Sequence, residues 1–297
     1  MKRHIKKVIN GVIAASIALG VAQGVSPQAT YAAQIVAKDY TNHAYKTHIE
    51  YVVKNRLMWT YPDGNFRPDQ AITQADLVVG LANAKGLTTG IPVSGLPANH
   101  WAKVYYERAK KDGILDSVVI NPSKVLNREE AALLMNNSWK SMFKSYQKKR
   151  PVYSDVAVNS GFLPKKAGKF ANGVSTTAYD GLGSVTRGEE AIALSLLHKD
   201  VLDTKNAEII AQQLHNSLKI SGGYLKGKVP TASGKDIRMF IVFKNDNAAS
   251  FYSGDDFMVN ASQVKFMQFT VKNSGQSKAL ASYEYSSGTD LTRKNTR

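Results

Sequence analysis

The chain has 297 residues, which is enough for about two domains. Its 39 basic and 23 acidic residues give a formal net charge of +16. Hydrophobic residues make up 43% of the chain, an ordinary globular composition that argues against global disorder. The absence of cysteine excludes disulfide scaffolds, cysteine-ligated zinc, thiolate nucleophiles and iron–sulfur clusters.

The first 33 residues have the three parts of a secretory signal peptide. Residues 2–7 carry four basic side chains, residues 8–25 form an uncharged apolar run, and residues 30–32 provide a small-x-small cleavage site. We expect cleavage after Ala32 or Ala33, and a secreted protein with no membrane span after cleavage. The alternative, a retained anchor, is disfavoured because glycines and a glutamine dilute the apolar run. A secreted basic protein predicts an anionic extracellular partner, such as a wall polymer, a membrane surface or free nucleic acid.

Three segments predict helix starts with the same signal, a capping residue followed three positions later by an acid. The pairs are Thr73 with Asp76, Asn127 with Glu130, and Thr186 with Glu189. The fifth, sixth and eighth positions after each cap are apolar, so one face of each helix is expected to be buried. The caps lie 54 and 59 residues apart, which indicates a threefold repeat.

The first half of each repeat predicts a shorter amphipathic helix followed by a loop. These helices are expected over 45–55 and 102–111, whereas the third copy begins near 152 and its helix is interrupted by glycine and proline. The first loop contains Pro62-Asp63-Gly64, which predicts a turn because proline presets φ and glycine accepts positive φ.

Helix, Asp-Gly loop and capped helix, at about 55 residues per copy, resemble the S-layer homology (SLH) domain. The resemblance is strongest between Tyr51 and Gly86, where residues 63–68 read DGNFRP and residues 72–76 read ITQAD. It implies a mainly α SLH triplet, a pseudo-threefold unit around a three-helix bundle. The residue pattern after Thr204 predicts that a small α+β domain follows it. The expected boundaries are 1–33 for the signal peptide, 34–89, 90–150 and 151–204 for the SLH repeats, and 205–297 for the C-terminal module.

The resemblance also implies a function. SLH copies hold secondary cell-wall polysaccharide, commonly through a pyruvylated sugar, in grooves between copies, so the protein is expected in the cell wall or S-layer. A ketal carboxylate needs a cation, and arginine offers a fork that fits it. Arg128 and Arg187, each one position after its cap, match the family's polymer-binding arginine, whereas the first copy has Gln74 and loses the charge.

Three further residues are candidates for polysaccharide contact, each with a structural alternative. Trp101 can stack on a sugar face, and packing in the core is at least as good an explanation. Asp63 and Gly64 can contact a ligand or simply make a turn.

The sequence predicts no metal, cofactor or catalytic site. The six histidines form no HExxH run or comparable ligand spacing, and neither a phosphate loop nor a GxSxG elbow is present. The acidic pairs Glu129-Glu130 and Glu189-Glu190 suggest catalytic carboxylates, but helix capping accounts for Glu130 and Glu189. No nucleic-acid partner is expected, because no helix-turn-helix or aromatic-basic RNA motif accompanies the positive charge.

The character of the sequence changes after Thr204. A helix is expected over 207–218, followed by β-rich runs and a disordered tail over 292–297; the runs are 224–229, 238–244, 251–252, 264–271 and 280–285. Two functions remain open. One is a noncatalytic wall-binding protein whose C-terminal module binds or assembles, with an S-layer or other surface protein as candidate partner. The other is an SLH-anchored wall hydrolase with its active site in 205–297. The aspartates of this module lie mostly in turn-like contexts, which favours the first.

Overall fold

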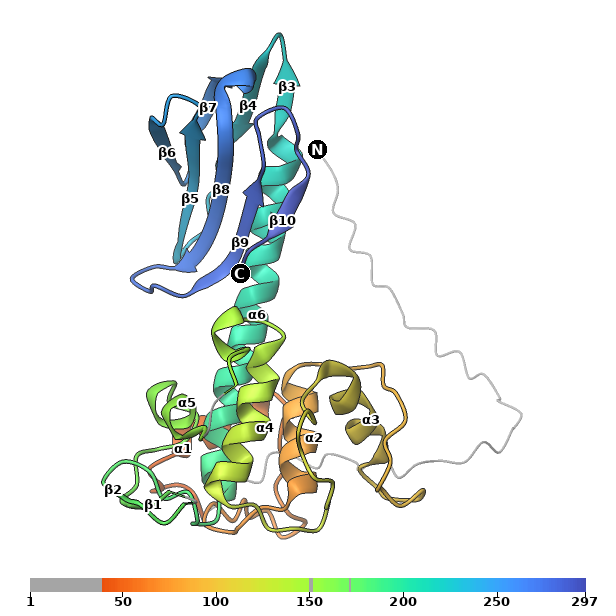
Figure 1. Ribbon diagram of the computed structural model, residues 1–297. Coiled ribbons are helices and arrows are strands. Elements are labelled where there is room, and N and C mark those ends of the chain that lie inside the picture. The colour runs from red at the N-terminus through yellow and green to blue at the C-terminus, as the bar shows by residue number, and fades with distance from the viewer. Residues whose placement is uncertain (1–38, 150–151, 171) are drawn as a thin grey trace, which may run out of the picture. The chain divides into compact units, whose positions relative to one another are not determined.

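The computed structural model describes residues 39–149, 152–170 and 172–297 (Figure 1). The expected signal peptide over residues 1–33 lies outside the described residues. The described residues form six α-helices and ten strands in three sheets. The expected fold class, a mainly α triplet around a three-helix bundle with a small α+β domain, is therefore wrong. Strands make up much of the chain after α6, and further short strands occur before it.

Three of the α-helices, α2, α4 and α6, begin where the capping signals predict. Their bounds are α1 Lys46–Lys54, α2 Gln74–Ala84, α3 Lys103–Asp112, α4 Arg128–Lys140, α5 Ser154–Asn159 and α6 Arg187–Ser217, with short 3-10 helices at Lys144–Tyr146 and Ala261–Gln263. The three predicted capping boxes are confirmed, because Thr73, Asn127 and Thr186 each accept from the backbone N–H three residues later. In each case the acid at that position bonds back to the cap backbone.

A closed ring of backbone hydrogen bonds joins the three caps. The N–H of Ile72 donates to the carbonyl of Val185 (3.0 Å), that of Val185 to Leu126 (3.1 Å), and that of Leu126 back to Ile72 (3.1 Å). All three side chains are fully buried. The ring satisfies backbone groups that burial would otherwise leave unpaired, and it holds the starts of α2, α4 and α6 against one another.

The last helix crosses the expected domain boundary at residue 204. α6 runs for 31 residues without interruption, since no glycine or proline occurs after Gly188. The helix expected over 207–218 is therefore the second half of α6. Its first half packs against α1, α2 and α4, and its second half against β4, β8 and β9. No helix of the described residues combines the length and apolar character needed to span a membrane.

The strands are all antiparallel, and most of them follow α6. The small sheet pairs β1 Gly168–Lys169 with β2 Ser175–Thr176. The second sheet has the order β3 Lys219–Ser221, β4 Tyr224–Lys228, β7 Asp256–Asn260. The third has the order β10 Arg293–Asn295, β9 Ala279–Tyr285, β8 Val264–Asn273, β5 Lys235–Phe243, β6 Ala248–Tyr252. Alternate residues of β5 and β8 are buried, which gives this sheet its apolar face toward α6 (Figure 1).

The expectation of a disordered tail is wrong. Residues 293–295 form β10 at the edge of the large sheet and pair with residues 283–285 of β9. The polar tail shows no alternation of hydrophobic and polar residues, so its strand depends on ladder bonds to β9 and on the side chain of Arg297.

Candidate functional site

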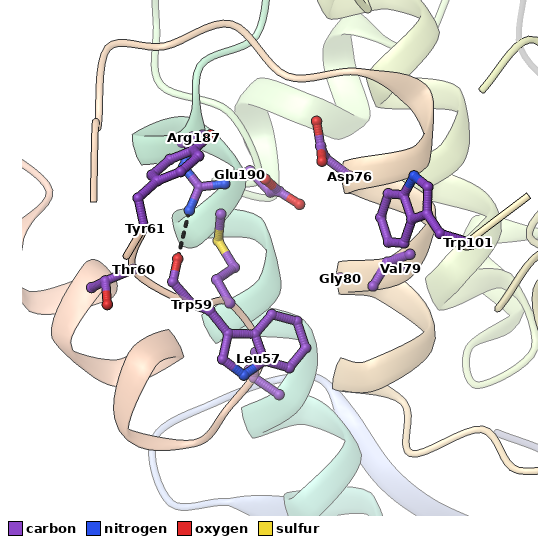
Figure 2. Close-up of a pocket in the computed structure, with 11 residues that line it drawn as sticks. Leu57, Trp59, Thr60, Tyr61, Asp76, Val79, Gly80, Trp101, Arg187 and Glu190 are labelled. Atoms are coloured by element: carbon purple, nitrogen blue, oxygen red, sulfur yellow. Dashed lines mark hydrogen bonds between the residues drawn. The ribbon is translucent and has the colours of Figure 1, made fainter. Parts of the chain in front are cut away.

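A pocket of about 250 Å³ lies between segments that are far apart in sequence (Figure 2). The loop after α1 forms one wall, the middle of α2 and Trp101 form another, and the first turn of α6 supplies two charged residues. The lining residues are Leu57, Met58, Trp59, Thr60, Tyr61, Asp76, Val79, Gly80, Trp101, Arg187 and Glu190. Each of the three expected repeats thus contributes to one cavity.

Arg187 is fixed in this pocket by the loop after α1. Its Nε donates to the carbonyl of Phe66 and its Nη2 to the carbonyl of Trp59, both at 2.8 Å. The guanidinium carbon lies 5.0 Å from the ring centre of Tyr61 and 4.8 Å from that of Phe66. Within the described residues, Nη1 makes no hydrogen bond, so a positioned cation retains free donors for an anion.

Glu190 is a fully buried acid in the same pocket. The sequence suggested it only as half of the acidic pair Glu189-Glu190 and did not predict it as a binding residue. Its Oε2 has no hydrogen-bond partner in the described structure. Burial raises the pKa of this carboxyl to about 8, with Arg187 acting to lower it and Asp76 to raise it further. The signal available in the sequence was its position: the corresponding residues after the other two caps are Leu77 and Ala131.

Gly80 makes room for this carboxyl. A Cβ at position 80 would lie 2.8 Å from Oε1 of Glu190 and 2.5 Å from Cδ1 of Leu194. Any side chain at Gly80 would therefore collide with α6 at the floor of the pocket.

Two exposed tryptophans complete the site. Trp101 is 64% exposed and Trp59 is 42% exposed, and Figure 2 shows them on different walls of the pocket. The exposure of Trp101 excludes the alternative that it packs in the core. Trp59 was not predicted as a site residue, because the local sequence shows only an aromatic residue near a turn. Indole faces and a fixed cation are suited to a sugar that carries an acidic group.

Arg128, the other predicted arginine, has no exposed surface. Its guanidinium pairs with Glu189, donates to the carbonyl of Pro164, and lies 5.5 Å from the ring centre of Tyr179. The structure therefore places its charge inside the protein and outside the lining of the pocket at Arg187.

Gln74 is buried in a similar way, with 3% of its surface exposed. Its Oε1 accepts from the hydroxyl of Tyr106 (3.0 Å) and the N–H of Asn121 (2.8 Å), and its Nε2 donates to the carbonyl of Val119 (2.8 Å). These bonds satisfy the amide within the fold.

Asp63 and Gly64 lie outside the pocket lining and form a turn. Asp63 pairs with Arg67 (2.9 Å) and accepts from the N–H of Asn65 (3.0 Å), and these two bonds lower the pKa of its exposed carboxyl. Gly64 has a φ of 81°, the left-handed conformation that glycine adopts without strain.

Comparison with protein families decides the nature of the matched segment. Residues 38–78 match the S-layer homology domain family. This partial match supports an SLH-domain protein. No curated protein matches the chain. An SLH domain indicates association with the cell surface, so this part of the sequence prediction is confirmed.

The matched SLH segment includes α1, the loop that binds Arg187 and the first turn of α2. Three other residues that line the pocket lie outside the matched segment: Trp101, Arg187 and Glu190. The SLH segment is therefore part of a larger site. In the described ranges, no group of three histidine, aspartate or glutamate side chains could hold a metal ion.

Proposed function

We propose that this protein is attached to the cell wall by an SLH triplet over 34–89, 90–150 and 151–204. Its pocket at Arg187 binds an acidic, pyruvylated sugar of secondary cell-wall polysaccharide. The observation that carries this proposal is a positioned guanidinium with free Nη1 donors in a pocket that two exposed tryptophans also line. The expected signal peptide fits a secreted protein of the wall or S-layer.

The case for three copies rests on a cyclic pattern of contacts. Gln74 reaches the loop at 119–121, Arg128 reaches Pro164, and Arg187 reaches the loop at 59–66. The side chain after each cap thus bonds to the loop of the next copy in order, with the third returning to the first. The backbone hydrogen-bond ring at Ile72, Leu126 and Val185 links the same three copies, with its donors running in the opposite cyclic sense.

The pocket chemistry favours one acidic sugar unit. A volume of about 250 Å³ lies below the roughly 300–1,000 Å³ of common small-molecule pockets, so it suits one sugar better than a long oligosaccharide. The carboxylate of a ketal would meet Arg187, and the ring faces would meet Trp59 and Trp101.

For residues 205–297 we propose a noncatalytic binding or assembly role, with an S-layer or other surface protein as partner. Hydrolysis of a glycosidic bond generally needs two facing carboxyl groups. Glu208 is bound by Tyr283 and Arg297, and Glu284 is exposed on β9. His215 stacks on Tyr285 beside the sheet. The alternative, an SLH-anchored wall hydrolase, predicts soluble fragments released from purified walls, lost in Glu284→Gln or in Asp255→Asn/Asp256→Asn.

Cosedimentation tests the anchoring. The folded chain without residues 1–33 should sediment with walls that keep their secondary polymer and stay in solution with stripped walls. Arg187→Ala should weaken sedimentation, while Arg238→Ala removes one exposed arginine of the C-terminal sheet as a matched control. Equal sedimentation with intact and stripped walls would contradict the proposal.

A further inference from the structure

Glu190 is the feature of the pocket that sugar binding by Arg187 leaves unexplained. A carboxyl group at this depth needs a partner, because burial of an unpaired polar group costs free energy and burial of an unpaired charge costs more. Oε2 has none among the described residues, and Oε1 lies against Gly80, where no side chain is present. Glu190 lines the pocket, so a ligand bound there can supply the partner.

The charged and titratable groups around Glu190 come from three elements. α6 contributes Arg187, α2 contributes Asp76, and the loop after α1 contributes the Tyr61 phenol; the remaining wall residue, Trp101, is uncharged. Asp76 is already engaged, since its Oδ2 accepts from the backbone N–H and the hydroxyl of Thr73, both at 2.8 Å. The charges of Asp76 and Arg187 cancel each other, so an ionised Glu190 gives the site a net negative charge.

This balance decides which form of Glu190 accepts an acidic ligand. An ionised Glu190 would offset the charge of Arg187 and repel a ligand carboxylate in a partly dehydrated site. A protonated Glu190 removes that repulsion and offers an O–H donor instead.

We infer that Glu190 is a specificity-determining residue that binds the acidic sugar as a neutral acid, donating a hydrogen bond to the ligand, so that an anionic ligand is released when Glu190 ionises. This inference rests on the proposed function of the pocket. It assigns the site to carboxylated sugars and couples their binding to one proton held by the protein. The pKa near 8 places this transition just above neutral pH.

Titration calorimetry with two synthetic probes tests the coupling. One probe is a 4,6-O-(1-carboxyethylidene) hexoside, and the other is its 4,6-O-ethylidene analogue, which lacks the carboxylate. The wild-type chain without residues 1–33 should bind the acidic probe with a constant Kd from pH 6 to about 8. Above that pH, Kd should rise toward tenfold per pH unit, the limit for linkage to one proton. The neutral probe should bind more weakly and with little pH dependence.

Glu190→Gln keeps the shape and a hydrogen-bond donor but cannot ionise, so its Kd for the acidic probe should stay constant from pH 6 to 9. Glu284→Gln, the same change at an exposed strand position, should keep the wild-type pH profile. Binding of the acidic probe with a flat profile in the wild type, or an unchanged profile in Glu190→Gln, would overturn this inference and leave the proposed function intact. No binding of the acidic probe at any pH would overturn both.

Discussion

Arg128 and Glu189 form an ion pair inside the protein, with 0% and 7% of their side chains exposed. The two residues are separated by 61 positions in sequence, and each lies in the first turn of a capped helix. Glu189 also accepts from the N–H of Thr186 (3.1 Å), so one carboxylate both caps α6 and neutralises the charge at the start of α4. Two helix starts therefore depend on one acid.

Loss of the Arg128 side chain should destabilise the fold. Arg128→Ala leaves Glu189 as a buried, uncompensated charge, so the free energy of unfolding should fall by about 3–5 kcal/mol. Urea unfolding followed by circular dichroism measures the change. Arg187→Ala, whose guanidinium is only partly buried, is the comparison and should lose much less stability. Equal losses in the two variants would contradict the structural role of Arg128.

Arg187 should show the opposite balance, a small effect on stability and a large effect on binding. Arg187→Ala should lower the affinity for wall polymer by about 1–3 kcal/mol, the range for hydrogen bonds to a charged group. Arg187→Lys keeps the charge. One ammonium, however, cannot reproduce a guanidinium that donates to the carbonyls of Trp59 and Phe66 and also offers donors to a ligand. Titration with isolated polymer should therefore rank wild type first, Lys second and Ala last. Full affinity in Arg187→Ala would exclude this pocket as the binding site.

These two arginines show what the sequence could and could not predict. Both follow a cap by one position, and that local pattern correctly predicted the helix starts, because a capping box is formed by residues three positions apart. Arg128 pairs with Glu189, whereas Arg187 lines an open pocket. This difference depends on neighbouring segments that are tens of residues distant in the sequence. Local pattern cannot specify that difference.

The same reason explains the residues that were missed. Glu190 and Trp59 become part of a site only when α6 packs beside α2 and the loop after α1. The alternating strands β5 and β8 were predictable from their own hydrophobic pattern. The uninterrupted α6 was not, because a change in composition near residue 204 was interpreted as a boundary although nothing there ends a helix.

Glu190 should also make stability depend on pH. Its folded-state pKa of about 8 lies above the ordinary value of 4.5, so the folded state retains a proton that the unfolded state has lost between these values. The contribution of Glu190 to the free energy of unfolding is therefore highest below pH 4.5 and falls as pH rises toward 8, by about 3 kcal/mol at pH 7.

Glu190→Gln should remove this dependence. Relative to wild type, the variant should become more stable as pH is raised from 5 to 8, as measured by urea unfolding at each pH. Glu284→Gln, at an exposed position of β9, should follow the wild type throughout. A constant difference between Glu190→Gln and wild type across this range would show that Glu190 is already ionised in the folded protein.

The last prediction concerns Arg297, which joins the edge strand β10 to the rest of the fold. Its Nε donates to the carbonyl of Met142 (2.7 Å), and its Nη1 donates to the carbonyl of Leu280 (2.7 Å) and to Glu208 (2.9 Å). Arg297→Ala should therefore lower the free energy of unfolding by about 2–3 kcal/mol, because it removes charge-assisted bonds at a partly buried site.

Hydrogen exchange gives the local test of that prediction. The N–H of Thr296 donates to the carbonyl of Ser282 (2.8 Å), next to the β10–β9 ladder, so amides in this segment should be protected in the wild type and exchange faster in Arg297→Ala. Arg238→Ala serves as the control, because Arg238 is exposed and, among the described residues, its side chain donates hydrogen bonds only to Ser250. Rapid exchange of residues 293–296 in the wild type would mean that the tail is not held as a strand, since ladder bonds that open freely give no protection.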